Sequence, residues 1–277
     1  MTGYSTLDIS GLQIVNEKRR NERREYNRQD CDASPVAGNV YKKVTALLLM
    51  LAVAIAVGAG VFNSTLFASY RVEGSGAPQE IMEFVDSNPE AAPFALNWEK
   101  YHNKSQGISI DSEVKKGTCP LFIQWDKRWG YRTYGGGQFL GITGCGPTCL
   151  SMVYSGLTGE TDMNPYKMAK FSEDHGYYVK GTGTAWTLMS DGASELGLKS
   201  KRLNSQKALL KALSNGHPVI ASMSAGDFTK SGHFILMTGL SDSGEICIND
   251  PNSPANSKKT WDMDRVYPQI KAMWSFS

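Results

Sequence analysis

Residues 119–159 read CPLFIQWDKRWGYRTYGGGQFLGITGCGPTCLSMVYSGLTG, and their centre is the segment Gly144-Cys145-Gly146-Pro147-Thr148. Pro147 suits the first turn of a helix, where its missing N–H is no loss, and apolar residues follow at helical spacing: Leu150, Val153, Tyr154 and Leu157. Cys145 would then lie at a helix N-terminus, where free backbone N–H groups and the helix dipole favour the thiolate. The pattern predicts a reactive cysteine, although a free cysteine is more often a small buried apolar residue.

Composition bounds the class of protein. The chain has 277 residues, of which 41% are hydrophobic, enough for one or two domains with a core. A net charge of +2 argues against a nucleic-acid partner. The five cysteines (31, 119, 145, 149 and 247) form no CxxC pair and show no zinc-like spacing, and no phosphate-binding loop is present. We therefore expect no cofactor and no metal.

The N-terminal part predicts a membrane anchor. Residues 1–43 are polar and rich in both basic and acidic residues, which is typical of a disordered tail. Residues 44–62, VTALLLMLAVAIAVGAGVF, contain no charge and are long enough for a transmembrane helix of ~20 residues. The alternative is a cleaved signal peptide, whose apolar region is usually about 7–15 residues long after a short basic start. The long leader and long apolar run favour an uncleaved anchor.

The charges that flank this run predict its orientation. Eight Lys and Arg residues precede it, at positions 18, 19, 20, 23, 24, 28, 42 and 43, whereas the next twenty residues carry only Arg71. The positive-inside rule then places residues 1–43 in the cytoplasm and everything after residue 62 outside the cell. Residues 63–118 are predicted to be an extracellular spacer with short helices, whose aromatic residues favour packing against the domain that follows.

Residues 119–277 are predicted to form one α+β domain, because helical patterns come first and β-rich runs follow. After the Cys145 helix, helices are expected from Asn164 to Gly176, from Thr184 to Gly197 and from Ser205 to Gly216. Short strands are expected over 218–223, 233–240 and 245–250.

A nucleophilic cysteine needs a base, and hairpin geometry selects His233 from the four histidines. The strand that begins at His233 turns at residues 241–244, so opposed residues of the hairpin should have position numbers that sum to about 485. His233 and Asp250 miss that sum by two, which places them one diagonal step apart, about 7–8 Å between Cβ atoms. We therefore interpret Asp250 as the acid that orients His233. For the other histidines (102, 175 and 217) a structural role is the better interpretation.

Acyl transfer also needs donors for the developing oxyanion. Gln124, in the segment Ile123-Gln124-Trp125-Asp126, precedes Cys145 in the chain. Its side-chain amide, together with the backbone N–H of Cys145, is a candidate oxyanion donor.

These motifs resemble, in order along the chain, the papain-like cysteine peptidases related to the leader-processing domains of bacteriocin exporters: Gln124-Trp125 with Trp129-Gly130-Tyr131, Gly144-Cys145-Gly146-Pro147-Thr148, Gly232-His233-Phe234 and Asn249-Asp250-Pro251. The chain is most similar to stand-alone, exported members, and the likeness extends from about Pro78 to Ser277. The resemblance implies a papain-like fold in which Gln124, Cys145, His233 and Asp250 are oxyanion donor, nucleophile, base and orienting acid. The chain lacks the exporters' transporter, so their double-glycine leader specificity is not carried over.

The sequence thus favours a membrane-anchored extracellular cysteine peptidase acting on an exported peptide or protein, or on cell-wall peptide. Two alternatives stay open: a cell-wall amidohydrolase or acyltransferase with the same residues, and a catalytically silent peptide-binding module. A zinc site of Cys145, Cys149 and His233 lacks the usual spacings, and Cys149 is interpreted as a buried helix residue. A disulfide between Cys119 and Cys247 is not decided by the sequence. Candidate substrate-binding residues are Trp125, Gly144 and Trp186, with Tyr134 and Asp227 as further groove candidates.

Overall fold

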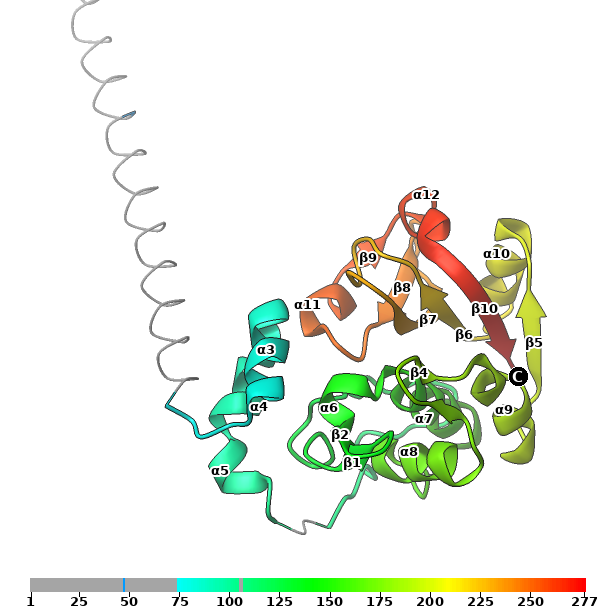
Figure 1. The fold of residues 1–277 in the computed structure, drawn as a ribbon. Coiled ribbons are helices and arrows are strands. Elements are labelled where there is room, and N and C mark those ends of the chain that lie inside the picture. Colours follow the sequence, from blue (N-terminus) through cyan, green and yellow to red (C-terminus); the bar gives the residue numbers. More distant parts are fainter. Residues whose placement is uncertain (1–46, 48–73, 105–106) are drawn as a thin grey trace, which may run out of the picture. The chain divides into compact units, whose positions relative to one another are not determined.

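The computed structural model describes residue 47, residues 74–104 and residues 107–277 (Figure 1). The predicted membrane span at 44–62 lies outside the described residues, apart from Leu47, as does the predicted tail at 1–43. Within the described part of the chain, no helix is both long and apolar enough to cross a membrane. The description below concerns residues 74–277.

The chain from residue 74 begins with a helical lead-in, which we define as residues 79–101. It comprises α3 (Gln79–Ser87), η1 (Pro89–Ala91), α4 (Ala92–Leu96) and α5 (Trp98–Tyr101). Its apolar residues form a separate core around Phe94, which also includes Tyr131. The ring of Phe94 stacks on Tyr131 with centroids 4.5 Å apart, and the Tyr131 hydroxyl donates to the Phe94 carbonyl at 2.7 Å. The lead-in is therefore packed against the segment that precedes Cys145.

A helical half follows. Its elements are β1 (Thr133–Tyr134), β2 (Gln138–Phe139), α6 (Leu140–Thr143), α7 (Cys145–Thr158), α8 (Pro165–Asp174), β3 (Tyr178–Val179), β4 (Gly183–Thr184), η2 (Trp186–Met189) and α9 (Asp191–Glu195). The side chain of Asn164 caps α8 by accepting from the N–H of Lys167. The helix expected between Thr184 and Gly197 is instead the short β4 followed by η2 and α9, interrupted at Ser190.

The second half is built on an antiparallel sheet with strand order β5-β10-β6-β7-β8-β9 (Figure 1). The strands are β5 (Ser200–Leu203), β6 (Val219–Met223), β7 (His233–Leu240), β8 (Ile246–Asn249), β9 (Thr260–Trp261) and β10 (Ile270–Phe276). Between them lie α10 (Gln206–Ser214), α11 (Pro254–Ser257), α12 (Met263–Val266) and η3 (Tyr267–Gln269). Helices and an antiparallel sheet in separate halves give an α+β architecture.

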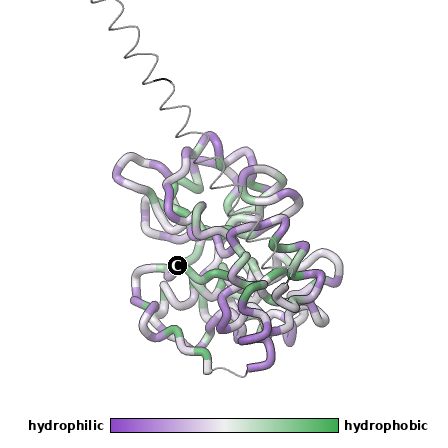
Figure 2. Tube along the Cα trace, turned by 90° about the vertical axis from the view of Figure 1, so that its left-hand side faces the viewer, coloured by the Kyte–Doolittle hydropathy of each residue, from purple (hydrophilic) through white to green (hydrophobic). Residues whose placement is uncertain are grey.

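Side chains of the central strands alternate between the two faces of the sheet, and both faces are buried. Phe234 and Leu236 of β7 join the core with α7 and α8, whereas Ile235 and Met237 join a second core with α10. Figure 2 shows apolar residues along segments in the interior and polar residues in the peripheral loops. Because α7 packs against β7, the start of the helix and the start of the strand meet at the boundary between the halves.

Candidate active site

Cys145 is the first residue of α7, as the glycine-proline pattern predicts. Gly144 precedes it as the N-cap residue, and its N–H donates to the Leu140 carbonyl at 2.8 Å. A Cβ at Gly146 would come within 2.7 Å of the Thr184 side chain, so glycine is needed for α7 to lie this close to β4. This packing holds Cys145, which is partly exposed, at the wall of a groove.

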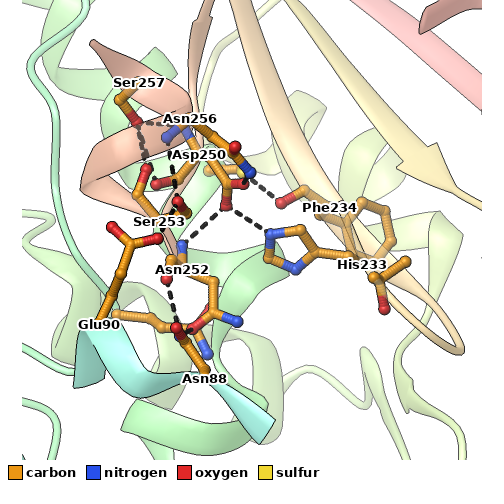
Figure 3. A network of polar contacts seen from close by, with 12 residues as sticks. Asn88, Glu90, His233, Phe234, Asp250, Asn252, Ser253, Asn256 and Ser257 are labelled. Carbon is orange, nitrogen blue, oxygen red and sulfur yellow. Dashed lines mark hydrogen bonds and ion pairs between the residues drawn. The ribbon is translucent and has the colours of Figure 1, made fainter. Parts of the chain in front are cut away.

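His233 begins β7 and faces Asp250, which directly follows β8. Leu236 pairs with Asn249 and Met237 with Ile248, the register that the turn predicts, whereas the pairs nearer the turn are shifted by one position. His233 Nε2 lies 2.7 Å from Asp250 Oδ1, and both side chains are almost entirely buried (Figure 3). Cys145 and His233 line the same groove, and Nε2 of the imidazole is engaged by Asp250, which leaves Nδ1 for the thiol.

The pKa shifts of Cys145 and His233 both favour the ion pair of thiolate and imidazolium. Burial alone raises the pKa of Cys145, but the hydrogen bond and charge of His233, with backbone hydrogen bonds from Phe234 and Gly146, lower it overall. Burial alone lowers the pKa of His233, but the charge and hydrogen bond of Asp250, with a contribution from Cys145, raise it to about 10. A thiolate beside an imidazolium is the reactive state of a nucleophilic cysteine.

Asp250 is held by groups besides the imidazole. The backbone N–H of Asn252 donates to Oδ1 and Asn256 Nδ2 donates to Oδ2, each at 2.9 Å (Figure 3). Burial raises the pKa of this carboxyl, but the charge of His233 and these hydrogen bonds lower it overall. The acid is therefore ionised and fixed in orientation although it is 1% exposed.

Gln124 lies beside the loop that carries Asp250, and its side chain is buried. Its Nε2 donates to the carbonyl of Gly141 at 2.9 Å and to that of Ile142 at 3.2 Å. Its Oε1 is buried without a hydrogen-bond partner among the described residues. The backbone N–H of Gln124 donates to the Pro251 carbonyl at 2.8 Å, which ties this segment to the loop that carries Asp250.

The groove beside Cys145 and His233 has a volume of about 690 Å³. Trp186, 44% exposed, forms part of its lining. Its Nε1 donates to Ser222 Oγ at 3.2 Å, and its ring meets the edge of Trp274, so the indole face is held in place. Lys271 also lines the groove and adds a positive charge.

The other predicted substrate-binding residues lie elsewhere. Trp125 packs against the loop that carries Asp250, where its Nε1 donates to the Asn252 carbonyl at 3.3 Å. Gly144 is covered by Leu140 and is not among the described residues that line the groove. Tyr134 is buried, with its hydroxyl bonded to Ser172 and Thr184. Asp227 pairs with Arg265, whose hydrogen bond and charge lower the pKa of Asp227 to about 2.

Some residues of the site carry no signal in the sequence. Ser222, Met223 and Lys271 reach the groove through the pairing of β6 with β10, strands separated by about fifty residues of chain. Asn256 has a local sequence signal: Ser253-Pro254 is a typical start of a helix, and that helix presents Asn256 to Asp250.

The remaining cysteines have different surroundings. Cys149 is fully buried one turn after Cys145, and its Sγ donates to the Phe234 carbonyl at 3.4 Å. Burial and the nearby charges of Cys145 and Asp250 raise the pKa of Cys149. Cys119 and Cys247 are both free thiols.

Among the described residues, no three His, Cys, Asp or Glu side chains are grouped so that they could hold a metal ion.

Comparison with known proteins addresses the family. A model described as the Peptidase_C39 like family matches residues 118–275, more than half of the chain. No curated protein matches the chain as a relative. The solved peptidase domain of Streptococcus ComA, a bi-functional ABC transporter involved in a quorum sensing pathway, is 18% identical, with a TM-score of 0.37 over 49% of this chain and 91% of that one. A Bacillus anthracis protein described as a C39-like peptidase is 13% identical, with a TM-score of 0.39 over 62% of this chain and 98% of that one. By the family match, this chain belongs to the Peptidase_C39 like family.

Proposed function

We propose that this chain is a cysteine peptidase that cleaves peptide bonds with Cys145 as nucleophile, His233 as acid and base, and Asp250 as the group that orients His233. One observation carries the proposal: Asp250 is bonded to His233 at 2.7 Å, and His233 lines one groove with Cys145, a cysteine at the start of a helix. Membership in the Peptidase_C39 like family supports the reaction class.

The proposed reaction has two stages. The Cys145 thiolate attacks the scissile carbonyl carbon, and the electron pair of the carbonyl moves to its oxygen. The carbonyl re-forms as the C–N bond breaks, the His233 imidazolium gives its proton to the leaving amine, and an acyl-enzyme remains. Neutral His233 then takes a proton from a water molecule, which attacks the thioester and releases the carboxylic acid. His233 keeps the proton that it took from water and Cys145 leaves as the thiolate, so the thiolate and the imidazolium are restored.

The oxyanion is stabilised by the backbone N–H of Cys145 and by the amide of Gln124. Gln124 already donates to two carbonyl oxygens, and the longer of these bonds, to Ile142 at 3.2 Å, is the one that a substrate oxyanion replaces. Removal of one oxyanion donor typically costs about 10²–10³ in kcat.

The proposed location is the outer face of a cell membrane, with one anchoring helix at residues 44–62. The support is the uncharged run itself and the excess of Lys and Arg before it. The proposed substrate is therefore an exported peptide or protein, or a wall peptide.

The experiment is hydrolysis by the purified full-length chain of a mixed library of unstructured peptides, with new termini identified by mass spectrometry. We expect cleavage by the wild type and by a control variant, Cys247→Ala, which changes a free thiol away from the groove. Cys145→Ala should produce no new termini. Equal cleavage by Cys145→Ala and wild type would contradict the proposed nucleophile.

The same experiment with wall fragments in place of peptides separates the two substrate classes. Release of free amines from purified peptidoglycan, with no cleavage of the library, would indicate a wall amidohydrolase instead of a peptidase. Binding of peptides without any cleavage would indicate a peptide-binding module instead.

A further inference from the structure

We propose that Glu90 and Asn88, in the lead-in, are positioning residues for Asp250, so that a segment outside the residues matched by the family model holds the acid of the site. The proposal rests on the proposed function, in which Asp250 orients His233. It is argued from the bonds between the lead-in and residues 250–257, which we name the acid loop.

Glu90 binds the acid loop at two points. Its carboxylate accepts a hydrogen bond from the Ser253 hydroxyl and another, at 2.8 Å, from the backbone N–H of Ala255 (Figure 3). Ser253 Oγ in turn accepts from the backbone N–H of Asn256 at 3.0 Å, and Asn256 Nδ2 donates to Asp250 Oδ2. The side chain of Glu90 thus fixes the turn that presents the Asn256 donor to Asp250 Oδ2.

Asn88 supports the other oxygen. Its Nδ2 donates to the carbonyl and to the side-chain Oδ1 of Asn252, each at 2.9 Å. The backbone N–H of Asn252 donates to Asp250 Oδ1, the oxygen that also meets His233. Both oxygens of Asp250 are therefore bound by residues that the lead-in holds.

The lead-in has its own attachment to the rest of the molecule. Phe94 is 1% exposed and stacks on Tyr131, and Ile81 and Ala91 are fully buried in the same core. This attachment does not involve Glu90. Loss of the Glu90 carboxylate should therefore leave the lead-in in place and release only its hold on the acid loop.

The consequence for the site is electrostatic. Asp250 raises the pKa of His233, and the imidazolium of His233 lowers the pKa of Cys145. If the acid loop loosens, Asp250 spends less time in the bonded orientation, so the pKa of His233 falls and that of Cys145 rises. A residue that acted only on stability would move neither pKa.

The test is the pH dependence of Cys145 alkylation by iodoacetamide in the full-length protein, together with the imidazole pKa of His233 from NMR titration. In Glu90→Ala we expect the midpoint of the Cys145 alkylation profile to move to higher pH by up to about one unit, because a higher pKa of the thiol delays formation of the thiolate. Glu90→Gln keeps one acceptor oxygen and should show a smaller change. The matched control is Glu80→Ala, an exposed carboxylate on α3.

A double-mutant comparison shows whether Glu90 acts through Asp250. In an Asp250→Asn background, Glu90→Ala should leave the alkylation profile unmoved. An unchanged profile in Glu90→Ala with wild-type Asp250, or an equal shift in both backgrounds, would overturn the positioning role. If the wild-type Cys145 shows no reactivity at pH 6, the proposed function fails, and the His233 titration still decides whether Glu90 positions Asp250.

Discussion

At the scale of single residues, His233 and Asp250 should be separable by mutation. His233→Ala removes the group that transfers protons, so we expect kcat to fall by about 10²–10⁴-fold. Asp250→Asn keeps an oxygen that can face His233 Nε2 and should retain more activity than His233→Ala. Steady-state kinetics on a cleaved peptide measures both, with His217→Ala as the control. A wild-type rate for His233→Ala would show that another histidine is the base.

The pH profile of the wild type follows from the same pair. Catalysis needs the Cys145 thiolate and the His233 imidazolium together, so kcat/KM should rise as pH passes through the lowered pKa of Cys145. It should fall as pH rises through the pKa of His233, which Asp250 raises to about 10. In Asp250→Asn the descending limb should move to lower pH. A wild-type descending limb near the usual histidine pKa of about 6.5 would contradict the Asp250–His233 interaction.

At the scale of elements, the position of α7 depends on a glycine at its far end. A Cβ at Gly156 would lie 2.7 Å from Cys119 Cα, a backbone atom that cannot give way cheaply. Overpacking costs about 1–3 kcal/mol, whereas alanine gains at most about 1 kcal/mol in helix propensity. We expect Gly156→Ala to lower the free energy of unfolding in denaturant titrations. Gly239→Ala is the control, because its Cβ meets no atom within 4 Å; equal stability of the two variants would show that α7 does not pack as described.

Local patterns were enough to predict several elements. The turn at residues 241–244 lies inside one hairpin, so the register of β7 and β8 could be predicted from it. Asn164 and Ser205 cap helices that begin one residue later, as expected. Local patterns do not predict the strands β5 and β10, because β10 pairs with β5 and with β6 across long stretches of chain. No local spacing reports such a contact.

The candidate site shows the same division between residues that local patterns predict and residues that only tertiary contacts bring together. Cys145, His233 and Asp250 could be selected from helix-start and hairpin geometry. Sequence patterns predict that Trp125 binds substrate, whereas its indole N–H bonds to the acid loop, a contact between residues 127 positions apart. The bonds of Asn88 and Glu90 to that loop span 163 to 165 positions and have no counterpart in sequence periodicity. Sequence patterns predict groups within one element or hairpin, and tertiary docking decides the rest.

At the scale of the whole molecule, the proposed anchor gives a prediction about topology. Protease added to intact protoplasts should remove epitopes placed after residue 62 and should leave a tag at the N-terminus protected. The physical reason is the excess of Lys and Arg before the apolar run, which favours retention of that side in the cytoplasm. Protection of the C-terminal epitopes instead would reverse the topology, and a soluble product that starts near Gly60 would indicate a cleaved signal peptide.

The central claim is that Cys145 is the activated nucleophile, and labelling at limiting iodoacetamide tests it directly. At about pH 6 an ordinary thiol is almost wholly protonated. Cys145 has a lowered pKa from His233 and the helix start, whereas burial raises the pKa of Cys149 and that of Cys119, the latter to about 12. Peptide mapping should therefore find Cys145 alkylated first, with loss of peptidase activity in proportion, while Cys149→Ser keeps its activity. Labelling of Cys149 while Cys145 stays free would contradict the account.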